Sequence, residues 1–185
     1  MSLLMTKRLF SRALSAALAG VLALSIVGTA AAAGQQTADV LWIKQDAPTG
    51  GTSTLTRTSS SISFMINANE LAPNNAYTVW WLVYNNPEAC GKTCKYNDVW
   101  HKKTGGQMFY ATGAVSSATG TATFTATFPE GTQLLDAETA AVMLVIRDHG
   151  VASTDPAILE EQLTTMNGGC GSPGCIDKQY VLHTP

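Results

Sequence analysis

The segment YTVWWLVY, residues 77–84, restricts the fold of this chain more than any other stretch. Its aromatic and β-branched residues predict a β-strand, in which successive side chains point to opposite faces of the sheet. Both faces of this strand are apolar. One carries Tyr77, Val79, Trp81 and Val83, and the other carries Trp80, Leu82 and Tyr84. The fold must therefore cover the second face of this strand with protein or with a ligand.

A second strand with two apolar faces is predicted from AVMLVIRD, residues 141–148. Val142, Leu144 and Ile146 alternate there with Ala141, Met143 and Val145. We expect these two strands to be central neighbours. A second sheet would cover one of their faces, and a helix with the disulfide loops would cover the other.

The other segments with alternating apolar and polar residues predict half-buried strands. In TATFTATF, residues 121–128, a row of threonines alternates with Phe and Ala and indicates one wet face. The predicted strands are 39–44, 53–58, 61–68, 77–84, 107–115, 121–128, 140–147 and 178–183. About eight short strands favour an all-β fold, an antiparallel two-sheet sandwich of Greek-key type.

One short helix interrupts the strands near residues 156–166. Asp155 is a suitable N-cap, Pro156 suits the first helical position, and Asn167-Gly168-Gly169 ends the helix. Between two strands, SSATG at residues 116–120 predicts a tight hairpin turn.

Residues 1–33 have the layout of a secretory signal peptide, with a basic head, an apolar run and small residues before Gly34. We therefore expect cleavage there, a β-sandwich domain over 34–185, no membrane span after removal, and a secreted or periplasmic location. Three of the 11 Lys and Arg residues lie in the signal, so the domain keeps 8 against 13 Asp and Glu, a net charge of −5. This acidic balance argues against nucleic-acid binding.

Four cysteines lie in two short motifs, CGKTC with Cys90 and Cys94, and CGSPGC with Cys170 and Cys175. An exported chain normally oxidises an even number of cysteines. Crossing bridges would close longer loops and stabilise more, whereas the turn residues inside each motif favour local bridges. We prefer local pairing. A four-cysteine zinc site is the rival, although its usual spacing has two residues between paired cysteines.

Three segments carry a resemblance to known proteins. LAPNNAYTVWWLVYNNPEAC, ATGAVSSATGTATFTATFPEG, and LVIRDHG with EQLTTMNGGC resemble uncharacterised exported bacterial proteins of one β-sandwich domain. The phrases AYTVWW and GTATFTATFPEG also resemble the sandwich of chordin-type domains. The resemblance covers most of the mature chain, and it implies no activity and no cofactor.

Two groups of residues are candidates for ligand binding. Flat aromatic rings can carry the apolar face of a glycan, and this hypothesis rests on the four tryptophans Trp42, Trp80, Trp81 and Trp100. The aromatic residues we select as candidates for a ligand site are Trp80, Tyr84 and Trp100, of which Trp100 is expected to be the most exposed. Arg147, Asp148 and His149 end a central strand, where Asp148 could orient the imidazole if a turn at Gly150 brings the two together.

No motif for a catalytic residue, a cofactor or a metal is present. The sequence therefore favours a disulfide-stabilised binding or structural module over an enzyme. The partner of this module would be a protein, a glycan or a small ligand. The alternative is an exported enzyme or copper protein with its site near His149.

Overall fold

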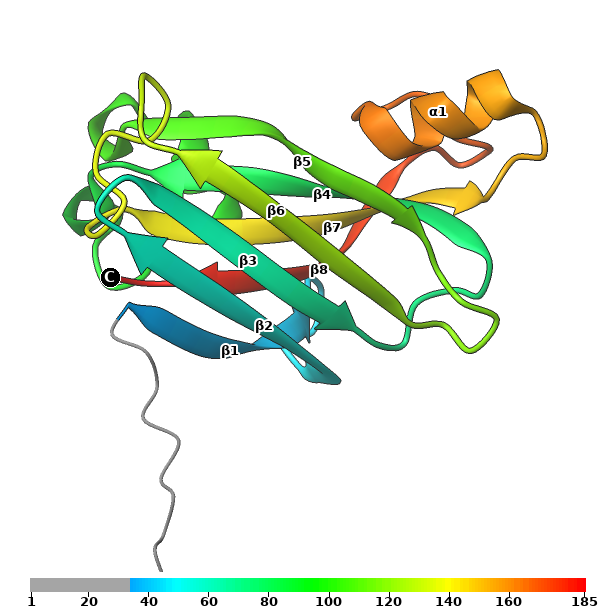
Figure 1. Cartoon of the computed structure of the whole chain (residues 1–185), viewed down its shortest axis with the longest axis horizontal. Coiled ribbons are helices and arrows are strands. Elements are labelled where there is room, and N and C mark those ends of the chain that lie inside the picture. The colour runs from blue at the N-terminus through cyan, green and yellow to red at the C-terminus, as the bar shows by residue number, and fades with distance from the viewer. Residues whose placement is uncertain (1–33) are drawn as a thin grey trace, which may run out of the picture. The chain divides into compact units, whose positions relative to one another are not determined.

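A computed structural model describes residues 34–185 of the chain (Figure 1). The signal peptide predicted for residues 1–33 lies outside this part. None of the helices in the described range has the length and the apolar composition needed to cross a membrane.

All eight predicted strands are present, in the predicted order, together with one α-helix and three short 3₁₀ segments. The strands are β1 (Gln35–Trp42), β2 (Pro48–Thr58), β3 (Ser61–Ala68), β4 (Asn75–Tyr84), β5 (Gly106–Val115), β6 (Ala122–Pro129), β7 (Ala141–Val151) and β8 (Ile176–His183). The 3₁₀ segments are η1 (Pro87–Cys90), η2 (Tyr96–Trp100) and η3 (Lys102–Thr104), and the helix is α1 (Pro156–Thr164). The mostly-β, antiparallel prediction is thus confirmed.

The strands differ from the prediction in forming one sheet, in the order β5-β4-β7-β8-β1-β2-β3-β6. The sheet curls until its two end strands come close together, and β1 and β8 join its halves through two paired positions, Leu41 with Tyr180 and Trp42 with Gln179. The alternation of apolar residues is the same in one curled sheet and in two stacked sheets. The pattern therefore identified the strands but not their arrangement.

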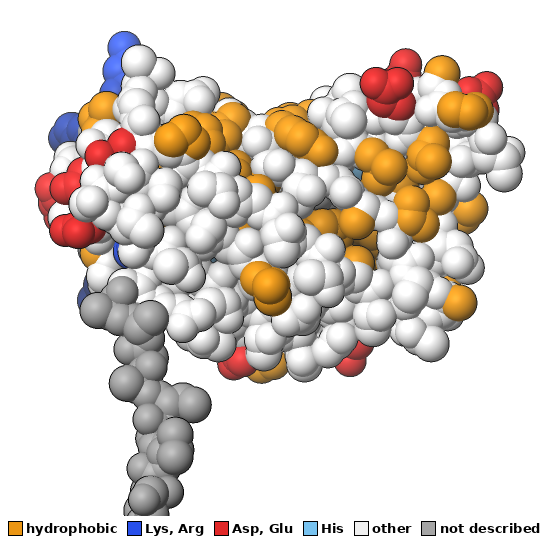
Figure 2. Space-filling model, viewed as in Figure 1, with side chains coloured by type: hydrophobic (Ala, Val, Ile, Leu, Met, Phe, Trp, Pro, Cys, Tyr) orange, Lys and Arg blue, Asp and Glu red, His pale blue; other side chains and the backbone are white. Residues whose placement is uncertain are grey.

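The two halves of the sheet face each other (Figure 1). Aromatic side chains fill the core between them. Trp81 of β4 lies with its ring centre 4.8 Å from that of Phe64 in β3 and 6.2 Å from that of Phe128 in β6. Phe109 of β5 stacks on Phe128 at 4.2 Å. The outer face of β2, β3 and β6 is polar, as the threonine row predicts, and appears largely white in Figure 2.

The two apolar faces of β4 and β7 divide as the sequence predicts. Tyr77, Val79, Trp81 and Val83 point into the core between the halves, with Val142, Leu144 and Ile146 of the neighbouring β7. Leu82 and Tyr84 pack on the outer face with Ala141, Met143 and Val145. There they meet Cys94 and Val99 from the segment between β4 and β5. That outer cover is protein.

Helix α1 covers the other end of the same outer face, over β4 and β5. Asp155 caps the helix by accepting from the N–H of Ala157 at 2.9 Å. A Cβ on Gly113 of β5 would lie 2.1 Å from the Leu163 carbonyl oxygen, so only glycine permits this approach. The predicted cover by a helix and a disulfide loop is confirmed.

The SSATG segment is not a hairpin turn. β5 pairs with β4 and β6 pairs with β3, so the loop after Val115 carries the chain from one half of the sheet to the other. A five-residue turn sequence specifies a reversal of direction, but it does not specify that the flanking strands bond to each other.

Candidate functional site

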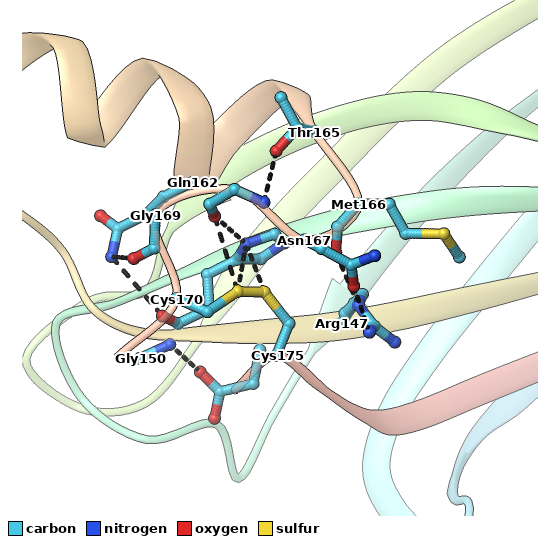
Figure 3. The surroundings of a disulfide bond; sticks show 12 residues. Arg147, Gly150, Gln162, Thr165, Met166, Asn167, Gly169, Cys170 and Cys175 are labelled. Atoms are coloured by element: carbon cyan, nitrogen blue, oxygen red, sulfur yellow. Dashed lines mark hydrogen bonds between the residues drawn. A yellow bond between two sulfur atoms is a disulfide. The ribbon is translucent and has the colours of Figure 1, made fainter. Parts of the chain in front are cut away.

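The first candidate site lies where β7 ends under the loop that follows α1 (Figure 3). Arg147 and His149 share the outer face of β7, since alternate residues of a strand point the same way. Arg147 Nε donates to the Met166 carbonyl at 2.8 Å, and its guanidinium also bonds the side chains of Asn167 and Asp177. Arg147 thus anchors the start of the loop and the start of β8.

Gln162 anchors the loop from the side of the helix. It is buried, and its Nε2 donates to the carbonyls of Val151 and Gly169 at 3.0 Å each. Its Oε1 accepts from the N–H of Ser153 at 2.8 Å. Every hydrogen-bonding group of this amide is used, so the helix, the end of β7 and the loop form one connected unit.

His149 is buried at the centre of this unit, and its hydrogen bonds define its tautomer. Nδ1 lies 3.0 Å from the carbonyl of Gly168, which can only accept, so Nδ1 carries the proton. Nε2 is therefore an acceptor, and the hydroxyl of Thr78 donates to it at 2.9 Å while accepting from Trp80 Nε1 at 2.9 Å. Burial lowers the pKa of His149, so the imidazole is neutral at pH 7.

Two sulfur atoms lie against the same imidazole. Nδ1 of His149 is 3.1 Å from Sγ of Cys175 and 3.5 Å from Sγ of Cys170. The structure pairs Cys170 with Cys175 and Cys90 with Cys94, which confirms the local disulfides and leaves no free cysteine for the four-cysteine zinc site. Within residues 34–185, His149, Cys170 and Cys175 form the one cluster of three or more His, Cys, Asp or Glu side chains that could hold a metal ion.

Asp148 does not orient His149, because it points to the opposite face of β7. Its carboxylate accepts from Asn75 Nδ2 at 2.9 Å and from the N–H of Gly150 at 2.8 Å, and it lies 3.8 Å from Lys178 Nζ. Gly150 has a positive φ of 88°, but the backbone there binds the carboxylate through the Gly150 N–H and does not bring it to the imidazole. Thr78 and Gly168 orient His149 instead.

The three aromatic candidates do not meet in one groove. Trp80 is half-buried beside Thr78, at the His149 end of β4. Tyr84 is fully buried at the other end, where its hydroxyl donates to the carbonyl of Lys95 at 2.9 Å. Trp100 is 64% exposed at the end of η2. Tyr84 thus has a packing role, and Trp100 is the most exposed of the three.

The second candidate site is a hollow of about 690 Å³ on the outer face of β1 and β8. Its apolar lining comes from Leu41, Ile43, Met143, Tyr96, Tyr180 and Leu182, and Thr93, Cys94 and Lys95 line it at the second cysteine of the Cys90–Cys94 bridge. No sequence motif marks these residues as a site. The available signal was the alternation of Tyr180 and Leu182 on the outer face of the last strand.

Charged groups stand at the rim of this hollow. Asp39, Asp46 and Lys95 are exposed there, and the hydroxyl of Tyr180 donates to Asp46 at 3.0 Å. Burial raises the pKa of Tyr96, and the negative charge of Asp177 raises it further, so this phenol is protonated at neutral pH. The hollow thus combines an apolar floor with charged groups and hydrogen-bonding hydroxyls at its edge.

Comparisons with known proteins return no matching family model, no matching curated protein and no matching solved structure. The candidate sites therefore rest on their geometry.

Proposed function

We propose that this chain is an exported, disulfide-stabilised binding module, and that the hollow on β1 and β8 is its ligand site. The signal-like layout of residues 1–33 supports export. The two disulfides support an oxidising compartment, since such bonds persist outside the cytosol. The ligand class is a small molecule with an apolar body and a polar or charged head.

One observation carries this proposal: the protein cover of the outer face stops before β8 and β1. Helix α1 lies over β4 and β5, and the segment from η1 to η3 lies over Tyr84 and Met143. Beyond Met143, the apolar side chains Tyr180, Leu182 and Leu41 continue along the same face and border the hollow. Partly exposed apolar side chains that line a hollow beside a few polar groups are typical of small-molecule sites.

The size and the chemistry of the hollow suit a small ligand. Its volume lies in the range of about 300–1,000 Å³ typical of small-molecule sites. Met143 offers a polarisable thioether, and Tyr96 and Tyr180 offer ring surface together with hydroxyl groups. Lys95 on one side and Asp39 and Asp46 on the other can bind a head group of either sign.

A matched pair of variants tests the hollow as a ligand site. Leu182→Trp fills it, whereas Leu135→Trp adds the same ring at a position that is 67% exposed and does not line it. We expect a neutral apolar dye, Nile red, to bind the parent protein and Leu135→Trp saturably, and Leu182→Trp at least about 10-fold more weakly. Methyl resonances of Met143 and Leu41 should shift with the dye. Unsaturable binding, or equal binding by both variants, would contradict the proposal.

A second candidate function keeps the site near His149 and is favoured by one observation. Its imidazole nitrogen lies within 3.5 Å of two cysteine sulfurs. Imidazole and, once the disulfide is reduced, thiolate are ligands of zinc and copper, so this candidate is a metal protein.

A further inference from the structure

We propose that His149, Cys170 and Cys175 form a zinc site that becomes available when the disulfide between the two cysteines is reduced. The proposal is independent of the hollow on β1 and β8. It concerns the loop between α1 and β8, which carries both cysteines over the end of β7 (Figure 3).

The three ligand atoms already converge. Nδ1 of His149 and the two Sγ atoms all lie within 4.8 Å of one another. A tetrahedral zinc ion with Zn–S bonds of about 2.3 Å and Zn–N bonds of about 2.0 Å holds each sulfur about 3.5 Å from the nitrogen and the two sulfurs about 3.8 Å apart. The distances from Nδ1 to the sulfurs, 3.1 and 3.5 Å, are already close to this, whereas the two bonded sulfurs must separate. Two thiolates and one imidazole are a known zinc ligand set, in which solvent or substrate fills the fourth position.

The loop has room to separate the sulfurs. Residues 171–174 between the two cysteines are exposed, and a Cβ placed on Gly171 or Gly174 would meet nothing within 4 Å. The segment before them is fixed, because Arg147 bonds residues 166 and 167 and Gln162 bonds Gly169. Reduction would therefore release residues 171–174 from the closed loop, while His149 and the segment before Cys170 stay in place.

The electrons and protons of the proposed step balance. An external dithiol reduces the Cys170–Cys175 bond, forming two cysteine thiols while the dithiol becomes a disulfide. Binding of Zn²⁺ then releases one proton from each thiol. The Nδ1 proton of His149 moves to Nε2, so the imidazole remains neutral and donates to Thr78, whose hydroxyl oxygen has a second lone pair for Trp80 Nε1.

The surroundings of the three side chains favour this chemistry. Thr78 supplies the outer hydrogen bond that fixes the orientation of a metal-bound ring. Cys170 and Cys175 are half-buried, so a reductant and solvent can reach them, whereas Cys94 of the other bridge is only 4% exposed.

The Cys90–Cys94 bridge offers a matched control, because it is also a local disulfide but belongs to no such His/Cys cluster in residues 34–185. The variant Cys90→Ser/Cys94→Ser keeps the proposed site, and Cys170→Ser/Cys175→Ser removes it. Each is reduced without oxygen and titrated with Zn²⁺ against a chromophoric chelator. We expect one tightly bound Zn²⁺ per chain in the first variant and none in the second. Equal binding by the two reduced variants would overturn the proposal.

Two further measurements use folded protein without altering His149. The oxidised parent must not bind Zn²⁺ at this site, and binding independent of reduction would overturn the gating by the disulfide. In reduced Cys90→Ser/Cys94→Ser, the ¹⁵N resonance of His149 Nδ1 must shift on addition of Zn²⁺ as the proton moves to Nε2. An imidazole spectrum unchanged at one equivalent of bound zinc would remove His149 from the site.

Discussion

Nε2 of His149 and the hydroxyl of Thr78 lie 2.9 Å apart, on neighbouring strands β7 and β4. The same imidazole bonds Gly168 through Nδ1, so one buried side chain joins the sheet to the loop after α1. Both hydrogen-bonding partners of His149 are neutral groups of the chain, so the neutral imidazole can be buried at the end of the strand without an unpaired polar atom.

Thr78→Val tests this connection. Valine keeps the shape of threonine but leaves Nε2 of His149 and the indole N–H of Trp80 without a partner. We expect the free energy of unfolding to fall by about 1–3 kcal/mol in urea denaturation. Thr78→Ser retains the hydroxyl and should lose clearly less, so equal losses in the two variants would show that the hydrogen bonds are unimportant.

Gly113→Ala tests the contact between α1 and β5. The added methyl group would overlap the Leu163 carbonyl, so the helix must move away at a cost of about 1–3 kcal/mol of unfolding free energy. Amide exchange of residues 156–164 should accelerate in this variant. Gly131→Ala, at a position with nothing within 4 Å, is the control and should change stability by less than about 0.5 kcal/mol.

Two tryptophans should respond very differently to truncation. Trp81 is fully buried against Phe64 and Phe128, so Trp81→Ala should lower the unfolding free energy by about 3–5 kcal/mol. Trp100→Ala should change it by less than about 0.5 kcal/mol, because that ring is 64% exposed. A large loss for Trp100→Ala would mean that this ring is packed in solution.

His183 should make stability depend on pH. It is buried and bonded to Ser53 Oγ at 2.9 Å, and burial, with the charge of Arg57, lowers its pKa to about 4. The unfolded chain has a pKa near 6.5, so below that pH it binds more protons than the folded chain. The contribution is full above pH 6.5 and is lost as the pH falls towards 4, by about 3 kcal/mol in all.

The variant His183→Gln isolates that effect. Glutamine places an amide near the position of Nε2, so it can bond Ser53 without titrating. Urea denaturation of both proteins between pH 7 and pH 4 should give a shallower loss of unfolding free energy for the variant. Part of the slope remains, because burial also lowers the pKa of His149. Identical slopes would contradict the assignment to His183.

Much of the fold could be predicted, because the alternation of apolar and polar residues along a segment shows which face of a strand is buried. The two-faced pattern around Trp81 predicted β4 and β7 as neighbours, and they pair, although they are second and third in the sheet order and not at its middle. The turn residues inside CGKTC and CGSPGC indicated local bridges. The ends of the strands were less accurate. The strand predicted to end at residue 147 continues in the structure through Asp148 and His149 to Val151, although these polar residues are typical of a strand end.

The candidate sites depended on contacts between distant residues. His149 and Cys175 are 26 residues apart, and no spacing rule connects them until α1 folds back over β7. The hollow needs the chain after Cys94 to lie beside the outer residues of β1 and β8.

The sequence by itself determined which residues form strands and which faces are apolar, and it favoured local pairing of the cysteines, because these features follow from alternation and from local chain geometry. Only the tertiary structure decided that the eight strands form a single curled sheet, that Asp148 turns away from His149, and where the outer cover stops. Those outcomes depend on packing between segments far apart in the chain, and the residue pattern within a segment is the same whichever distant partner it meets.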